Sequence, residues 1–225
     1  MPTSRERLID AAFALFDERG FEETTVDDVA ERAGVGRTTF FRAFKSKEDV
    51  IFPDHAVVLG AIRDRLASAT DATAPVAVTE AARLVLLHYL GEGDRARIRY
   101  RLTRSVPTLQ AREVASQRQY QQAFRTFVHE WLGGTAETEL RAELMANAVV
   151  TAHNHVLRRW LRGQIGTAAA QSEFHEAMAE VLRLYGSAAG GTGGHETAVV
   201  VLRTSRPLDE VLPALREAVG GSAEG

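Results

Sequence analysis

The 225-residue sequence contains no cysteine. Disulfide bonds, thiolate zinc sites and cysteine nucleophiles are therefore excluded, and a reducing compartment is compatible with the composition. The sequence also lacks any apolar run that approaches the roughly 20 residues of a membrane span, and its N-terminus has no apolar core of signal-peptide length. We therefore expect a soluble cytoplasmic protein with no membrane partner.

Signatures of common enzymes are missing as well. There is no glycine-rich phosphate-binding loop, no nucleophile elbow and no His-Glu metal motif. His153 and His155 lie close in sequence, but on a helix their side chains would point about 200 degrees apart, which is poor geometry for a shared metal ion. We expect no cofactor, no metal site and no catalytic residue, and an enzyme is the least favoured of the alternatives.

What is present is an ordinary globular composition, with 45% hydrophobic and 25% charged residues. Such a chain has enough apolar material to bury a core. Apolar residues recur at helical spacing up to about residue 186, and no alternating strand pattern occurs before residue 197. The pattern predicts an all-α fold with helices over 4–19, 26–33, 37–43, from 47 onward, 54–69, 76–91, 94–105, 109–132, 136–163 and 168–185.

Local capping signals mark the first helices. Thr25, followed by Asp28 three residues later, has the pattern of a capping box that begins a short helix. Gly20 is expected to form the left-handed cap that ends the helix before it. Pro53 is tolerated only in the first turn of a helix, so we expect a distortion or restart around it.

The segment from residue 24 to residue 50, TTVDDVAERAGVGRTTFFRAFKSKEDV, has the spacing of a helix-turn-helix. Such a motif needs polar side chains near the start of its second helix to reach base edges, and cations beyond it to meet phosphates. Residues of the first kind are Arg37, Thr38, Thr39 and Arg42, and residues of the second kind are Lys45 and Lys47. Because residues 36–47 include four cations and no acid, we expect an uncompensated positive patch, although Lys45 as a merely solvated side chain is an alternative.

With these residues the sequence resembles the TetR family of transcriptional regulators. The first helix, the capped TTVDDVAERAGV, the aromatic-rich third helix and the closing FKSKEDV follow the family's order over about residues 4–51. The resemblance implies phosphate contacts by Thr25, Thr39, Phe41 and Lys47, and positions near the bases for Arg37, Thr38 and Arg42. Family members commonly carry a tyrosine where this sequence has Phe41, so a hydroxyl contact to phosphate would be missing there.

In the family the last two long helices form a four-helix bundle with a second copy, so the resemblance implies a homodimer. A two-fold dimer presents two recognition helices about one DNA turn apart, which suits a palindromic double-stranded operator. The interface residues that the resemblance implies are Leu140, Leu144, Ala148, Ala152, Met178 and Val181.

Two further segments, RIRYRLTRSVPTLQAREVASQRQYQQAF (97–124) and HNHVLRRWLRG (153–163), are similar to a TetR subgroup that includes the mycofactocin-system regulators. This similarity implies a small-molecule inducer such as an acyl-CoA or another apolar-tailed anion. The candidate ligand-binding residues are Arg99, Tyr120, Phe124, His153 and Trp160. Two alternatives stay open: the aromatic stripes fill the core, and the arginines of residues 95–104 reach solvent or pair with acids.

The predicted organisation has three parts. Residues 1–51 form a three-helix DNA-binding domain with the helix-turn-helix, and residues 52–186 form a larger helical domain for ligand binding and dimerisation. Residues 187–225 form a glycine-rich linker and a short β-α extension, with a strand over 197–202 and a helix over 207–219. The expected function is a transcriptional regulator, a repressor that a small molecule releases from its operator. The main alternative is a helical interaction protein without specific DNA binding.

Overall fold

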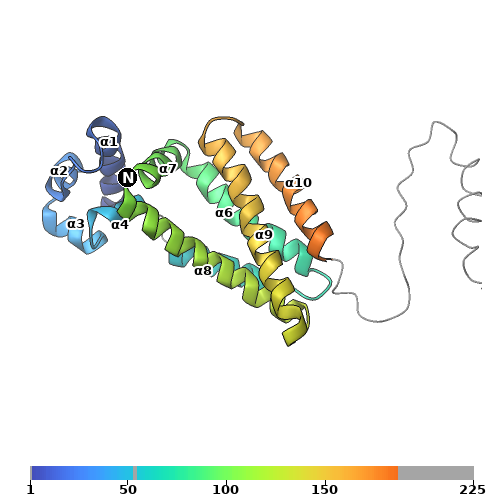
Figure 1. Ribbon diagram of the computed structural model, residues 1–225. Helices are drawn as coiled ribbons and strands as arrows, with labels where there is room; N and C mark the ends of the chain where they lie inside the picture. The colour runs from blue at the N-terminus through green and yellow to red at the C-terminus, as the bar shows by residue number, and fades with distance from the viewer. Residues whose placement is uncertain (1, 53–54, 187–225) are drawn as a thin grey trace, which may run out of the picture. The chain divides into compact units, whose positions relative to one another are not determined.

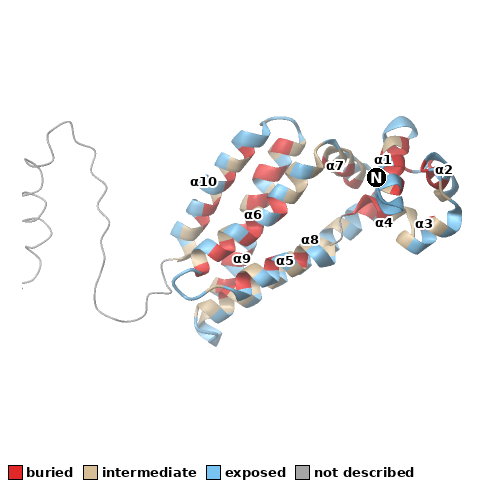
Figure 2. Cartoon of the chain, turned by 180° about the vertical axis from the view of Figure 1, so that it is seen from behind, coloured by how far each residue is buried: buried red, intermediate tan, exposed pale blue. Residues whose placement is uncertain are grey.

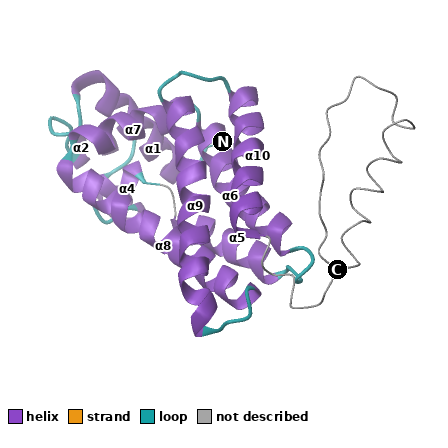
Figure 3. Ribbon diagram, turned by 45° about the vertical axis from the view of Figure 1, so that its right-hand side comes forward, coloured by secondary structure: helices purple, strands orange, loops and turns teal. Residues whose placement is uncertain are grey.

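The computed structural model describes residues 2–52 and 55–186, and every regular element in these ranges is a helix (Figure 1, Figure 3). The prediction of an all-α fold is confirmed for this part of the chain. The strand expected over 197–202 and the helix expected over 207–219 lie outside the described residues. None of the described helices combines the length and hydrophobicity that crossing a bilayer requires.

Four helices form the N-terminal part of the described chain: α1 (Ser4–Arg19), α2 (Val26–Arg32), α3 (Arg37–Ala43) and α4 (Lys47–Ile51). The predicted capping box is present at the start of α2, where the Thr25 hydroxyl accepts the Asp28 N–H and the Asp28 carboxylate accepts the Thr25 N–H. Gly20 has the expected positive φ of 91°, but its ψ of 163° is extended, so α1 ends without the left-handed helical cap.

Six further helices follow in the described part of the chain: α5 (His55–Ala67), α6 (Ala74–Glu92), α7 (Asp94–Ser105), α8 (Pro107–Trp131), α9 (Ala136–Leu161) and α10 (Thr167–Tyr185). Their ends agree closely with the predicted ones, and α7 has the predicted bounds. Pro107, which lies between the helices predicted over 94–105 and 109–132, is the first residue of α8. A proline fits there because the N–H of a first helical residue has no partner within the helix.

Two hydrophobic cores hold these helices, and Figure 2 shows the buried faces turned inward. The N-terminal core joins α1 to α4 through buried side chains such as Leu8, Phe16 and Phe40, and it also includes Val106 and Leu109 from the corner between α7 and α8. The bundle core lies among α5 to α10. The α7–α8 corner is therefore the part of the bundle that packs directly on the first helices.

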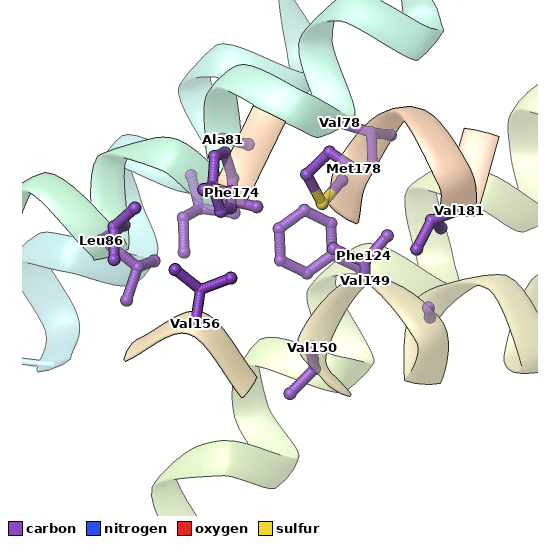
Figure 4. Close-up of a cluster of buried hydrophobic side chains, with 14 of the residues drawn as sticks. Val78, Ala81, Leu86, Phe124, Val149, Val150, Val156, Phe174, Met178 and Val181 are labelled. Atoms are coloured by element: carbon purple, nitrogen blue, oxygen red, sulfur yellow. The ribbon is translucent and has the colours of Figure 1, made fainter. Parts of the chain in front are cut away.

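Two residues expected at the interface between copies lie inside the bundle core. Met178 is fully buried and Val181 nearly so, and Figure 4 shows both among core side chains that include Phe174. The expectation of an intermolecular role for them is wrong, because α10 turns this face towards α6 and α9. By contrast, Leu140 and Leu144 on α9 are 67% and 46% exposed, as an interface would require of the single chain.

Candidate nucleic-acid interface and ligand cavity

The outward face of α3 results from how the helix is anchored. Phe40 is fully buried and Phe44, directly after the helix, is nearly so, and their rings lie 5.7 Å apart in the N-terminal core. This anchoring leaves Thr38 and Arg42 on the exposed side of α3 and Thr39 half-buried. Small polar groups and a cation thus line one accessible helix face, as base and phosphate contacts need.

The positive patch is less free than predicted. The Arg37 guanidinium lies 2.6 Å from both carboxylate oxygens of Asp27 on α2. The Lys47 ammonium donates to the carbonyl of Phe21 at 2.6 Å and lies 4.1 Å from that residue's ring centre. The expectation of four uncompensated cations is therefore wrong, because folding brings α2 and its acid against the start of α3.

Arg42 and Lys45 are the remaining cations of the patch, and both are exposed. Within residues 2–52 and 55–186 neither forms an ion pair. Arg5 on α1 adds a cation that the sequence pattern missed: its guanidinium lies 4.9 Å from the Phe44 ring, and it shares a surface groove with Lys45. No local signal identifies Arg5, since its neighbourhood depends on how α1 packs against α3.

The hydroxyl of Thr25 is already hydrogen-bonded, whereas the ring of Phe41 is accessible. The Thr25 hydroxyl donates to the Asp28 carboxylate at 2.6 Å, so it is already used in the capping box. This hydroxyl, the Thr25 N–H and the Arg19 guanidinium together lower the pKa of Asp28 to about 2. Phe41 is 46% exposed, and the Arg37 guanidinium lies 5.2 Å from its ring centre.

A cavity lies between α6, α7, α8 and α9. Its space for the centres of water-sized spheres is about 70 Å³. Four of the five predicted ligand-binding residues line it, namely Arg99, Tyr120, Phe124 and His153. Apolar walls come from residues such as Val149 and Val150, which Figure 4 labels beside Phe124. Sequence reasoning missed the contribution of α6, whose Tyr89 follows Val85 by one turn along the wall.

Trp160 is the predicted ligand-binding residue that does not line this cavity. It is buried in the bundle core, its Nε1 donates to the Thr167 hydroxyl at 3.3 Å, and the Arg97 guanidinium lies 4.9 Å from its ring. The indole therefore has a polar partner and a packed environment without a ligand, and the structure favours the alternative that Trp160 is a core residue.

Arg99 lines the cavity, but its charge is compensated. Its two terminal nitrogens bind the Glu92 carboxylate at 2.5 and 2.7 Å, and its Nε donates to the carbonyl of Ile51 at 2.5 Å. The side chain is buried, with the rings of Phe13 and Tyr89 within 5.8 and 5.6 Å of the guanidinium carbon. One residue therefore contacts the cavity wall, α1 and the end of α4.

Other arginines of this region also pair with acids, which was the alternative interpretation of the arginine-rich segment. Three pairs connect the bundle to the first helices: Arg95 with Asp10, Arg101 with Asp17 at 2.5 Å, and Arg112 with Asp49 at 2.5 Å. The arginine-rich segment is thus used to hold α7 and α8 against α1 and α4.

Two of the polar side chains that line the cavity, Tyr120 and His153, differ in their hydrogen bonds. The Tyr120 hydroxyl lies 2.7 Å from His55 Nδ1, and burial raises the Tyr120 pKa. His153 Nδ1 lies 3.1 Å from the Asn154 side-chain oxygen, while Nε2 has no hydrogen-bond partner in the described part of the chain. Burial lowers the pKa of His153 to about 4, so this imidazole is neutral at physiological pH.

Comparison with known proteins gives matches of two kinds. Residues 8–52 match the family model described as bacterial regulatory proteins, tetR family. The chain is 26% identical over 166 residues to MftR of Mycobacterium tuberculosis, named as a transcriptional regulator of mycofactocin biosynthesis, covering 72% of this chain and 82% of the relative. Over 47 residues, 21% of each chain, it is 49% identical to the HTH-type transcriptional regulator TcmR of Streptomyces glaucescens.

Among solved structures, the fold is similar to SmeT of Stenotrophomonas maltophilia in its complex with triclosan, with a TM-score of 0.60 and 18% identity over 89% of this chain and 99% of that one. The likeness extends beyond the first four helices to the bundle that holds the cavity. With the helix-turn-helix geometry of α2 and α3, the match over residues 8–52 assigns these first helices to the DNA-binding region of the tetR family of bacterial regulatory proteins, and the chain is similar to DNA-binding transcriptional regulators.

Proposed function

We propose that this regulator is a repressor that binds operator DNA through α3 and is released when a small molecule occupies the cavity. The observation that carries the proposal is Arg99, which lines the cavity and also donates to the carbonyl of Ile51 at the end of α4. A ligand that moves Arg99 would act on α4 and thereby on the helix-turn-helix. Such a ligand weakens DNA binding only by the factor by which it binds the conformation that does not bind DNA more tightly than the one that does.

For the DNA contacts we propose different roles along α3. Thr38 and Arg42 are exposed and would reach base edges, and Arg37 would do so after exchanging Asp27 for the DNA. The residues that would approach the phosphate backbone are Thr25, Thr39, Phe41, Lys45 and Lys47. Lys47 would keep its bond to the Phe21 carbonyl while adding a phosphate, since an ammonium has three donors.

We also propose that the chain acts as a homodimer. The exposed leucines of α9, Leu140 and Leu144, continue at four-residue spacing into the half-buried Ala148 and Ala152, and Leu184 on α10 is also exposed. Monomers rarely leave such a stripe uncovered. In this proposal residues 1–51 read the DNA and residues 52–186 bind ligand and partner, as expected from the sequence.

The ligand class is open within the proposal. The relative MftR is named for mycofactocin biosynthesis, and SmeT was solved with triclosan, so neither fixes the ligand of this chain. The resemblance to the mycofactocin-system regulators implies an acyl-CoA or another apolar-tailed anion. The cavity itself favours a second class, uncharged aromatic compounds.

Selection of DNA from a random library with the full-length chain tests the operator part. A repressor of this kind should enrich a palindrome whose half-sites lie roughly 10 base pairs apart, centre to centre. A mobility-shift titration with the enriched DNA then measures release by candidate ligands. If no sequence is enriched, the helical interaction protein without specific DNA binding is the better description.

A further inference from the structure

Resting on the proposed function, we infer that the cavity takes a compact uncharged ligand that donates a hydrogen bond to Nε2 of His153. The inference depends on three observations: the size of the cavity, the way its charged groups are already paired, and the hydrogen-bonding state of His153. The three observations are independent of one another, and each narrows the class of ligand that fits the cavity.

Size excludes a large ligand in this conformation. The cavity offers about 70 Å³ to the centres of water-sized spheres. Since one water needs about 10 to 15 Å³ by this measure, roughly five waters or one aromatic ring would fill it. A coenzyme A thioester would have to leave its nucleotide and phosphates outside, where the cavity lining contributes nothing.

Charge excludes an anion. The cation of the lining, Arg99, is held on two sides by the oxygens of Glu92 and at its Nε by the Ile51 carbonyl. Glu113 adds a carboxylate to the same lining. An anionic ligand would therefore lose its hydration and meet a compensated guanidinium together with a like charge, which is unfavourable in a desolvated site.

His153 supplies the specific contact. Its Nδ1 faces the Asn154 oxygen at 3.1 Å, and because a carbonyl oxygen only accepts, the ring proton sits on Nδ1. Nε2 of this neutral imidazole is then an acceptor; it is buried without a hydrogen-bond partner in the described part of the chain, and its residue lines the cavity. A buried acceptor without a partner carries an energetic cost that a hydroxyl or N–H of the ligand removes.

Three single-ring probes of matched size test this assignment on the full-length chain by calorimetry. 4-Ethylphenol donates a hydrogen bond, 4-ethylanisole cannot donate, and 4-ethylbenzoate is an anion. We expect 4-ethylphenol to bind about tenfold more tightly than 4-ethylanisole, the equivalent of one buried hydrogen bond, and 4-ethylbenzoate to bind more weakly than both. Equal binding of the phenol and the anisole, tighter binding of the benzoate, or no binding of the phenol would overturn the inference.

Variants locate the effect. In His153→Ala the preference for phenol over anisole should disappear, whereas His153→Gln retains an acceptor and should keep part of it. His155→Ala, an exposed histidine two residues further on α9, is the matched control and should leave the preference unchanged. A preference that survives in a folded His153→Ala variant contradicts the assignment.

The same titrations distinguish a failure of this ligand assignment from a failure of the proposed repressor function. If decanoyl-CoA binds and releases the selected operator while 4-ethylphenol does neither, the repressor proposal stands and the inference is wrong. If 4-ethylphenol binds through His153 but operator affinity does not change, the inference stands and ligand release fails.

Discussion

Arg99 and Ile51 are joined by a 2.5 Å hydrogen bond from the guanidinium Nε to the backbone carbonyl, across 48 positions of sequence. Ile51 is the last residue of α4, and Arg99 lies on α7 in the wall of the cavity. The last four carbonyls of a helix lack partners within it, so Arg99 satisfies a group that α4 cannot satisfy itself. The bond connects the end of α4, the helix next to the helix-turn-helix, to the lining of the cavity.

Replacing Arg99 with Ala is expected to lower the free energy of unfolding by about 3 kcal/mol. The substitution leaves the Glu92 carboxylate, largely buried, and the Ile51 carbonyl without their donor, and breaking a buried ion pair from one side is costly. Urea unfolding followed by circular dichroism measures the loss. In the same variant, operator and ligand should bind more independently of each other.

The matched control is Arg101→Ala. Arg101 pairs with Asp17, but its side chain is 60% exposed, and exposed pairs contribute about 0 to 1 kcal/mol. If the free energy of unfolding falls equally in the two variants, the buried contacts of Arg99 contribute no more to stability than an exposed ion pair.

Asp27→Asn is expected to raise the affinity for DNA of any sequence. The change removes an acid that lies beside α3 and releases the Arg37 guanidinium, so the salt dependence of binding should steepen by about one phosphate equivalent. Because the pair is exposed on both sides, stability should change little. Mobility-shift titrations at several salt concentrations provide the measurement. Asp64→Asn, an equal charge change on the remote α5, should leave the slope unaltered.

The helices were predictable because their signals are local. Thr25 with Asp28, and the glycines that follow α1 and α2, act within one turn of the chain, and short spacing is what a sequence displays directly. The pairing of Arg37 with Asp27 and of Arg99 with Ile51 was not predictable, since both depend on which helix packs against which. Four predicted ligand-binding residues on α7, α8 and α9 line one cavity, whereas the contribution of α6 was missed and Trp160 does not line it.

Thr25→Ala should reduce stability by about 1 kcal/mol, the usual effect of removing a helix N-cap, and should change the acid response. The pKa of Asp28 is lowered to about 2 by Thr25 and Arg19 from an ordinary 3.8. Its interactions are therefore fully present above about pH 4 and are lost as the pH falls towards 2. In the variant, an NMR titration of the Asp28 carboxyl should show a pKa closer to 3.8. An unchanged value would contradict the role of Thr25.

Leu144→Glu tests the proposed dimer. Leu144 is 46% exposed on α9, between the more exposed Leu140 and the half-buried Ala148, so a charge there should oppose burial against a second copy without entering the chain's own core. We expect the mass in sedimentation analysis to halve at unchanged helical content.

Operator affinity should fall by about a hundredfold or more, because two linked DNA-binding domains bind that much more tightly than one. Leu84→Glu, an equally simple change at a 40% exposed leucine of α6, should keep both mass and affinity. If Leu144→Glu stays dimeric while Leu84→Glu dissociates, the interface lies on α6 and the assignment to α9 and α10 is wrong.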